Sequence, residues 1–231
     1  MNPPAGPCTG RGRFITLEGG EGAGKSTQVE ALMGSLERSG IAALRTREPG
    51  GSAGAEAIRR LLLDGADERW DAVSEVLLLN AARHDHVTRL IMPALVRGVW
   101  VVSDRFLDST LAYQGYGRGV PIVDLIAAQR LAIGDFRPDL TLILDLPVAE
   151  GLARAARRGG SADRFERLDR DFHERLRHGF RAIAGDNPER CVLIDARGSP
   201  ETVHRTILVA IRQRLGASLA DASDASDGSD H

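Results

Sequence analysis

Eight residues near the start of the chain restrict its fold more than any others. Residues 19–26 read Gly-Gly-Glu-Gly-Ala-Gly-Lys-Ser and match the pattern G-x-x-x-x-G-K-[ST]. A short apolar stretch over 14–18 precedes them, and helical periodicity begins at residue 25. In this context the glycines let backbone N–H groups point at phosphate oxygens, and the start of a helix favours the same anions. The pattern therefore predicts a P-loop that binds a nucleoside triphosphate.

Lys25 is the only lysine among the 30 basic residues of the chain. A compact ammonium on a flexible stem is not interchangeable with a planar guanidinium, so we expect this position to need a point charge. Lys25 is predicted to reach the β- and γ-phosphates of ATP, and the Ser26 hydroxyl to bind Mg²⁺. The predicted ATP-binding residues of the loop are Gly19, Gly20, Glu21, Gly22, Ala23, Gly24, Lys25, Ser26 and Thr27.

The composition excludes several classes of protein. The 231 residues, 42% of them hydrophobic, fit one domain with a sizeable core. A formal net charge of −2 gives no basic footprint for nucleic acid. No apolar run approaches the roughly 20 residues of a membrane span. The two cysteines, Cys8 and Cys191, lie far apart, which favours a reduced, cytoplasmic protein.

Strand and helix signals alternate along the chain. Apolar, strand-like stretches lie at 14–18, 41–45, 99–103, 140–145 and 191–195. Helical periodicity covers 25–39, 54–63, 71–96, 121–133, 148–158, 166–184 and 200–215. This alternation predicts an α/β fold with a five-stranded parallel sheet and helices on both faces. Ligands of such folds bind at the carboxyl ends of the strands.

Both ends of the chain have a composition that is typical of disorder. Residues 1–12 are rich in proline and glycine, and residues 217–231 repeat alanine, serine and aspartate. Such segments bury little apolar surface. We therefore expect a folded domain over 13–216, between a disordered N-terminal segment and a disordered acidic tail.

Residues beyond the P-loop indicate which class of P-loop protein this chain belongs to. A GTPase would need an Asn-Lys-x-Asp motif, which a chain with no lysine besides Lys25 cannot contain. Arg47 follows the second strand-like stretch, and Asp104 and Arg105 follow the third. Arginines at strand ends fit a phosphate-bearing acceptor. A kinase of another small acceptor and a nucleotide-binding regulatory module remain alternatives, although the module would not need these arginines.

Together with the P-loop, four further segments resemble bacterial thymidylate kinases, which are P-loop nucleoside monophosphate kinases. In order along the chain they are residues 46–51, 104–105, 109–115 and 134–140, within a resemblance that spans about 13–215. The resemblance implies ATP-dependent phosphorylation of dTMP to dTDP in dTTP synthesis. It also implies Mg²⁺ with ATP, a short lid at about 154–166 and a homodimer, for which the apolar 71–96 helix could supply the interface.

The resemblance also implies roles for single residues. Arg47 and Arg105 would hold the acceptor phosphate, and Asp104 would hold the water shell of Mg²⁺. Glu21 would face the acceptor sugar, and Arg83 and Gln114 would contact the thymine edge. Arg47 and Arg105 could instead form surface ion pairs. Ser109 and Thr110 would lie near the base, or could instead be helix caps.

Further arginines follow at the lid and near the C-terminus. Arg154, Arg157, Arg158 and Arg164 surround the pair Gly159-Gly160. In the family that the chain resembles, a catalytic arginine comes either from the P-loop or from the lid. Of the variable P-loop positions here only Glu21 is charged, so the resemblance implies a catalytic arginine in the lid, at Arg154, Arg157 or Arg158. A solvated basic helix face is the alternative. Residues 195–198 at the end of the last strand, which include Arg197, resemble the family's loop that contacts adenine.

One position departs from the family pattern. The aromatic residue that stacks on thymine usually lies four positions before the base-reading arginine, where this chain has Leu79. Leu79 and Arg83 would share a helix face. Leu79 could instead be core, with Phe106 or Tyr113 filling the pocket. His84 and His86 flank Asp85 and are interpreted as a solvated helix face, because residues two apart do not face each other on a helix.

Overall fold

The strands form one parallel sheet in the order β2-β3-β1-β4-β5, as the alternation of signals predicted. The computed structural model describes residues 10–64, 69–158 and 168–221. Within them the strands are β1 (Phe14–Gly19), β2 (Ala43–Arg47), β3 (Trp100–Asp104), β4 (Leu140–Asp145) and β5 (Cys191–Asp195). The strand that enters the P-loop is therefore the central one, with two strands on either side.

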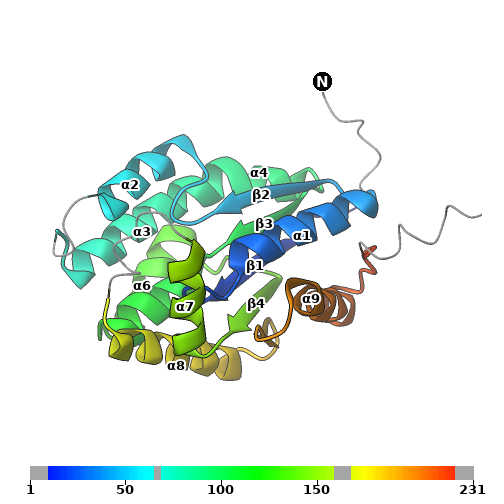
Figure 1. Ribbon diagram of the computed structural model, residues 1–231. Helices are drawn as coiled ribbons and strands as arrows, with labels where there is room; N and C mark the ends of the chain where they lie inside the picture. The colour runs from blue at the N-terminus through cyan, green and yellow to red at the C-terminus, as the bar shows by residue number, and fades with distance from the viewer. Residues whose placement is uncertain (1–9, 65–68, 159–167, 222–231) are drawn as a thin grey trace, which may run out of the picture.

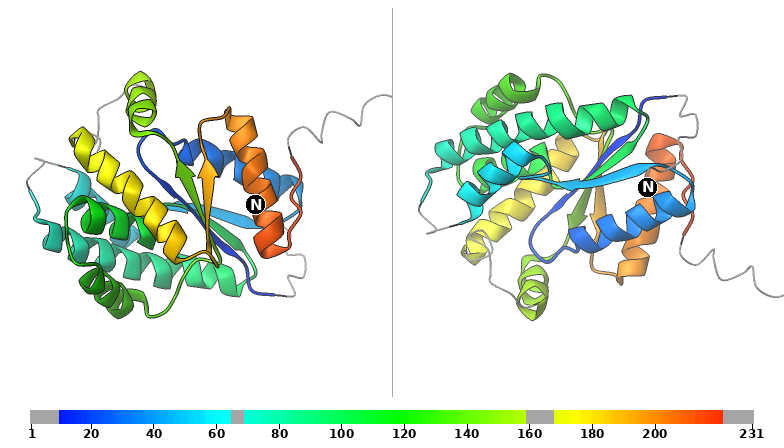
Figure 2. Two further views of the ribbon diagram at one scale, coloured as in Figure 1. Left: turned by 90° about the horizontal axis from the view of Figure 1, so that it is seen from below. Right: turned by 90° about the horizontal axis from the view of Figure 1, so that it is seen from above.

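Helices cover both faces of this sheet (Figures 1 and 2). On one face lie α1 (Lys25–Arg38) and α9 (Pro200–Leu215), and on the other α4 (Met92–Val96), α5 (Leu107–Thr110) and α8 (Arg170–Asp186). The remaining helices are α2 (Ala53–Leu63), α3 (Ala72–His86), α6 (Ile122–Ile133) and α7 (Val148–Arg158), with π-helical turns η1 (Val87–Ile91) and η2 (Leu111–Gly117). Among the described segments, no helix is long and apolar enough to cross a membrane.

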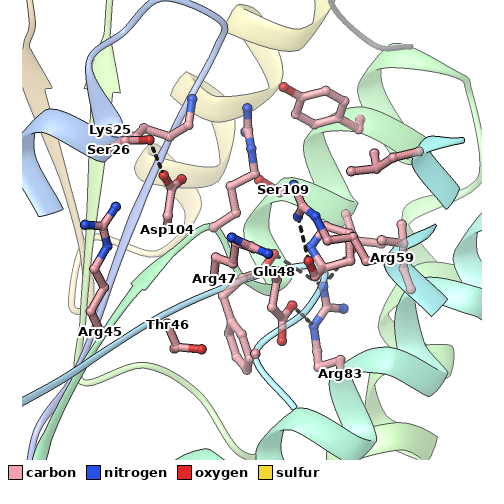
Figure 3. Close-up of a pocket in the computed structure, with 18 of the residues that line it drawn as sticks. Lys25, Ser26, Arg45, Thr46, Arg47, Glu48, Arg59, Arg83, Asp104 and Ser109 are labelled. Carbon is pink, nitrogen blue, oxygen red and sulfur yellow. Dashed lines mark hydrogen bonds and ion pairs between the residues drawn. The ribbon is translucent and has the colours of Figure 1, made fainter. Parts of the chain in front are cut away.

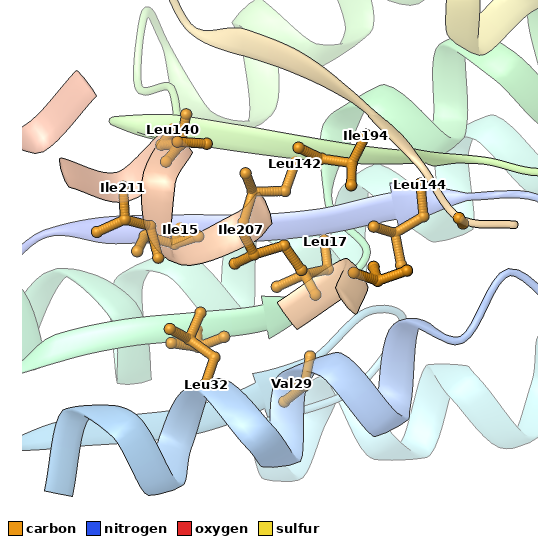
Figure 4. Packing of buried hydrophobic residues seen from close by; sticks show 14 of the residues in the cluster. Ile15, Leu17, Val29, Leu32, Leu140, Leu142, Leu144, Ile194, Ile207 and Ile211 are labelled. Atoms are coloured by element: carbon orange, nitrogen blue, oxygen red, sulfur yellow. The ribbon is translucent and has the colours of Figure 1, made fainter. Parts of the chain in front are cut away.

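The largest part of the core lies between the sheet and the pair α1 and α9. Aliphatic side chains of the central strands meet aliphatic side chains of both helices there (Figure 4). They include Ile15, Leu17, Leu140, Leu142, Leu144 and Ile194 on the strands, and Val29, Leu32, Ile207 and Ile211 on the helices. Because the sheet is also covered on its other face, its strands read as near-continuous apolar runs, which is what made them visible in the sequence.

Several predicted boundaries are wrong. Strand β2 covers 43–47 and not 41–45, so that Arg47 is its last residue and pairs in register with Asp104. Helix α8 begins at residue 170. The helix predicted over 71–96 contains the π-helical turn η1, and Pro93 is the second residue after that turn. The helical segment 107–117 was not predicted at all, because its glycines and β-branched residue have low helix propensity and its packing against α8 decides the conformation.

Residues just outside the predicted 13–216 range also make contacts with the folded part of the chain. The backbone N–H of Gly12 donates to the Leu95 carbonyl at 2.8 Å. Beyond α9, Ala217 and Leu219 pack against the core of α1 and α9, and the Ala220 N–H donates to the Ser39 hydroxyl at 2.8 Å. The acidic composition of the C-terminal segment gave no indication that Ala217 and Leu219 would pack against the core. Residues 1–9 and 222–231 lie outside the described residues.

A fully buried carboxyl group fastens α5 to the central strand. Glu18 on β1 accepts hydrogen bonds from the Phe106 N–H at 2.7 Å and from the Ser109 hydroxyl at 2.5 Å. The nearby Asp108 is buried as well and is bound on both oxygens by Arg190, at 2.7 and 2.8 Å. Burial, followed by the charge of Asp108, raises the pKa of Glu18 to about 8. The turn that follows β3 is thus held by the Glu18 carboxyl group, whose pKa is far above the ordinary value.

The substitution Glu18→Gln should change how stability depends on pH. A folded-state pKa near 8, raised from an ordinary 4.5, means that the neutral acid stabilises the fold below about pH 4.5 and that this contribution is lost as the pH rises through 8. The glutamine variant has no such group to titrate, so its free energy of unfolding relative to wild type should rise between about pH 4.5 and 8 and level off above pH 8. Urea denaturation across this range measures it.

The exposed Glu150→Gln variant is the matched control and should follow the wild-type pH profile. Parallel profiles for wild type and Glu18→Gln would contradict the raised pKa of Glu18.

Candidate active site

Parallel pairing brings three strand ends to one edge of the sheet. Strands β2, β3 and β1 are neighbours, with Arg47 opposite Asp104 and Asp104 opposite Leu17. The P-loop leaves β1 at this edge, so residues far apart in the sequence surround one cavity of about 910 Å³ (Figure 3). The predicted site residues thus come together where ligands of parallel sheets bind.

The P-loop conformation depends on glycine and on Lys25. Gly22 has a φ of 67°, and a Cβ atom there would collide with the carbonyl oxygen of Gly151. The Lys25 ammonium donates to the carbonyls of Gly19 at 3.1 Å and Gly20 at 2.8 Å. Burial, and then the charge of Arg105, lower the pKa of Lys25. The side chain is therefore held across the loop, where it can contact a bound phosphate.

Ser26 and Asp104, the two predicted Mg²⁺ residues, are brought into contact. The Ser26 hydroxyl donates to the Asp104 carboxylate at 2.7 Å, and both residues line the cavity (Figure 3). In the described part of the chain there is no cluster of three or more histidine, cysteine and acidic residues for a metal. A hydroxyl and one carboxylate fit Mg²⁺, which takes few protein ligands and completes its shell with water and substrate phosphates.

Glu21, Arg105 and Tyr113 form a buried cluster beside the P-loop. The Glu21 carboxylate accepts from Arg105 at 2.8 Å and from the Tyr113 hydroxyl at 2.6 Å. Burial acts to raise the pKa of Glu21, but Arg105, Lys25 and the Tyr113 hydroxyl outweigh it and bring the pKa to about 2. Glu21 is therefore ionised at neutral pH. Arg105, whose φ is 71°, lies with its guanidinium 5.0 Å from the centre of the Tyr113 ring.

Arginines line the cavity beyond the P-loop. Arg47 is half exposed and pairs with Glu56 at 3.1 Å. Arg45 and Arg59 also line this cavity, and sequence reasoning missed both. Arg45 could have been found, because residues 45 and 47 share a face of β2. No sequence signal distinguished Arg59 from its neighbour Arg60 on α2.

Arg83 and Gln114 form the enclosed end of the cavity, which Leu79 also lines. Arg83 is buried and donates to Glu48 at 2.8 Å and to Thr110 at 2.9 Å. Gln114 donates to Glu75 at 3.0 Å. Within the described residues, Arg83 Nη1 and Gln114 Oε1 have no partner. One donor and one acceptor are thus available to a ligand.

The helix-cap alternative for Ser109 and Thr110 is wrong. Both lie inside α5, which begins after Phe106, and their hydroxyls bind Glu18 and Arg83. Phe106 is fully buried and packs edge-on against Phe14, with ring centres 4.9 Å apart.

The interpretation of the two histidines is half wrong. His84 is exposed, as predicted, but His86 is fully buried and bonded to Thr46 and Glu48. The sequence showed only that the two residues do not face each other, and not which face of the helix is covered.

A second cavity of about 350 Å³ adjoins the P-loop. Gly22, Gly24 and Thr27 line both cavities. Arg154 lines the second one and donates to the carbonyls of Ala196 at 3.1 Å and Arg197 at 3.3 Å. The P-loop therefore lies between these two cavities.

The remaining predicted arginines are less closely associated with the cavities. The Arg197 guanidinium pairs with Asp195 at 2.7 Å and is largely exposed. Arg157 is exposed on α7, and Arg158 is the last residue of that helix. The side chain of Arg158, together with Arg164 and most of the predicted lid, lies outside the described residues.

Comparisons with known proteins agree on one family. The family model described as Thymidylate kinase matches residues 17–207. Thymidylate kinase of Bradyrhizobium sp. (strain BTAi1) is 56% identical over 93% of this chain and 96% of its own length. That of Rhodopseudomonas palustris (strain CGA009) is 58% identical, over 89% and 90%. The crystal structure of thymidylate kinase from Ehrlichia chaffeensis matches with a TM-score of 0.70 at 33% identity, over 87% of this chain and 99% of that one. The chain belongs to the thymidylate kinase family.

Proposed function

We propose that this protein transfers the γ-phosphoryl group of ATP to dTMP, giving ADP and dTDP, in dTTP synthesis. One observation carries the proposal: the P-loop with Lys25 lies between two cavities, one of which is lined by arginines and ends in a free donor and a free acceptor. Catalysis of this kind needs positioning and charge stabilisation, and little covalent chemistry from the protein.

On the donor side, ATP would occupy the second cavity with its phosphates on the P-loop. Lys25 would contact the β- and γ-phosphates, and Ser26 and Asp104 would hold Mg²⁺ and its water shell. When bound, Mg²⁺ neutralises the developing charge on the phosphates. Arg154, through its contacts with the carbonyls of residues 196 and 197, would shape the adenine end. A lid arginine, Arg154, Arg157 or Arg158, would stabilise the transition state.

On the acceptor side, the chemistry of thymine supports dTMP. Thymine presents an acceptor at O4 next to a donor at N3–H, and these complement Arg83 Nη1 and Gln114 Oε1. Cytosine presents the opposite pattern. Arg47 and Arg105 would bind the phosphate as guanidinium forks, and Glu21, held ionised, would face the sugar. Ser109, Thr110 and Tyr113 would support these groups. The cytoplasmic location expected from the two lone cysteines stays a prediction.

The activity test is ADP production from MgATP with dTMP, dUMP, CMP or AMP as the acceptor. We expect turnover with dTMP, and little with CMP or AMP. Lys25→Met should lower turnover by more than about a hundredfold, near 2.7 kcal/mol, while the chain stays folded, because the ammonium contacts phosphate and the loop carbonyls and not the hydrophobic core. If no monophosphate stimulates ADP formation, the regulatory-module alternative is favoured.

Leu79→Phe tests the departure from the family pattern. Leu79 lines the acceptor cavity one helical turn from Arg83. Base–aromatic stacking contributes about 1–3 kcal/mol in single-strand binding sites, and leucine recovers part of it by burial. We expect the KM for dTMP to fall about threefold to thirtyfold, for a gain of roughly 0.7–2 kcal/mol, with the KM for ATP unchanged. Steady-state kinetics with each substrate varied measures both, and an unchanged or raised KM for dTMP would remove Leu79 from the stacking position.

We propose that the protein is a homodimer through α3. Val73 and Leu77, four residues apart on one face of α3, are 59% and 62% exposed. The flanking helices α2 and α6 add the exposed Leu61, Val123 and Ile126.

The substitution Leu77→Glu tests this interface. In sedimentation-velocity measurements the variant should sediment as a monomer, because it places a charge in a desolvated interface. Val96→Glu, an equally exposed apolar position on α4, should leave the dimer intact. A monomeric wild type would contradict the proposal.

A further inference from the structure

His86 joins two parts of the acceptor cavity without lining it. The ring is fully buried at the end of α3. Its Nε2 lies 2.7 Å from the Thr46 hydroxyl and its Nδ1 lies 3.1 Å from Glu48 Oε1. Thr46 and Glu48 are the residues on either side of Arg47. One side chain therefore holds both neighbours of an arginine that faces the acceptor.

Glu48 carries this contact on to a second arginine. Its Oε2 accepts from Arg83 Nε at 2.8 Å, while its Oε1 accepts from His86 (Figure 3 shows the Glu48–Arg83 pair). The side chains of Glu48 and Arg83 are only 5% and 1% exposed, so water cannot replace a lost partner easily. With both oxygens bound, the carboxylate has one orientation, and so has the guanidinium that it holds.

Arg83 is the group whose orientation matters for a ligand. Its Nη2 is taken by Thr110 and Phe106 and its Nε by Glu48, and only Nη1 has no partner within the described residues. A rotation of the guanidinium would move this one available donor away from the cavity. The chain of contacts thus runs from Thr46 through His86 and Glu48 to one nitrogen without a partner, Arg83 Nη1.

We infer that His86 is a positioning residue for the acceptor, acting through Glu48 on Arg83. This rests on the proposed function, because it assumes that dTMP binds in the larger cavity. The contacts of His86 lie on the acceptor side, and neither the P-loop nor the smaller cavity touches them. Loss of the His86–Glu48 contact therefore weakens dTMP binding and leaves ATP binding unchanged.

Two substitutions separate the two contacts of the ring. Asparagine places its amide nitrogen near the Nδ1 position and keeps a donor for Glu48, whereas glutamine reaches the Nε2 position and keeps only the Thr46 contact. His86→Gln should raise the KM for dTMP at least about tenfold, near 1.4 kcal/mol, with the KM for ATP and the kcat at saturating dTMP within about twofold of wild type. His86→Asn should stay within about threefold for every constant.

The experiment is steady-state kinetics with each substrate varied, together with calorimetric titration of dTMP into the ATP-free protein and thermal melts of each variant. His84→Gln is the matched control on the exposed side of the same helix and should behave as wild type. Titration of thymidine, which has no phosphate, should show the same loss in His86→Gln if the effect passes through Arg83.

The outcomes are distinct. A wild type with no dTMP-dependent ADP formation overturns the proposed function itself. If the wild type is active, the role of His86 is overturned by any of three results for His86→Gln. These are an unchanged KM for dTMP, an equal rise of the KM values for dTMP and ATP, and thymidine binding as tight as in wild type. If His86→Gln does not fold, His86→Asn decides alone: a KM for dTMP within about threefold of wild type supports the assignment, and a tenfold rise in the folded variant overturns it.

Discussion

The parallel pairing of β1 with β3 is the constraint on which the rest of the site depends. It sets Leu17 opposite Asp104, so that the P-loop leaves the sheet beside the end of β3. The contact between Ser26 and Asp104 and the ion pair between Glu21 and Arg105 both follow from this register. A slip of one residue would turn every side chain of the strand to the other face of the sheet. The core of α1 and α9 on one side, and of α5 and α8 on the other, prevents that slip.

Charge pairing explains how so many ionisable groups can be buried around this edge. Glu21 pairs with Arg105, Glu48 with Arg83, and Asp108 with Arg190, and each pair joins two elements that are distant in the sequence. Such pairs need not add stability over apolar packing, but removal of one member leaves a buried charge without a partner. Their effect is therefore on geometry, since each pair fixes one guanidinium or carboxylate in one orientation, and the first two pairs do so at the cavity wall.

The same arrangement divides the site into a donor half and an acceptor half, each built from different elements. The donor half consists of the P-loop and the loop after β5, which Arg154 of α7 contacts. The acceptor half is built on β2, α3 and the 107–117 segment, joined by Glu48, His86 and Glu18. Only the P-loop and its Lys25 belong to both. Substitutions in one half are therefore expected to change the binding of one substrate.

The sequence by itself determined the fold class and the P-loop. The P-loop is a local structure, encoded by eight consecutive residues, and strands buried on both faces read as apolar runs. The segments at 46–51 and 109–115 likewise pointed, through resemblance, to residues that line the larger cavity. Tertiary structure alone decided the helical conformation of 107–117, the burial of His86, the packing of Leu219, and the presence of Arg59 in the cavity. Each of these depends on contacts between residues far apart in the chain, and local periodicity and propensity carry no information about such contacts.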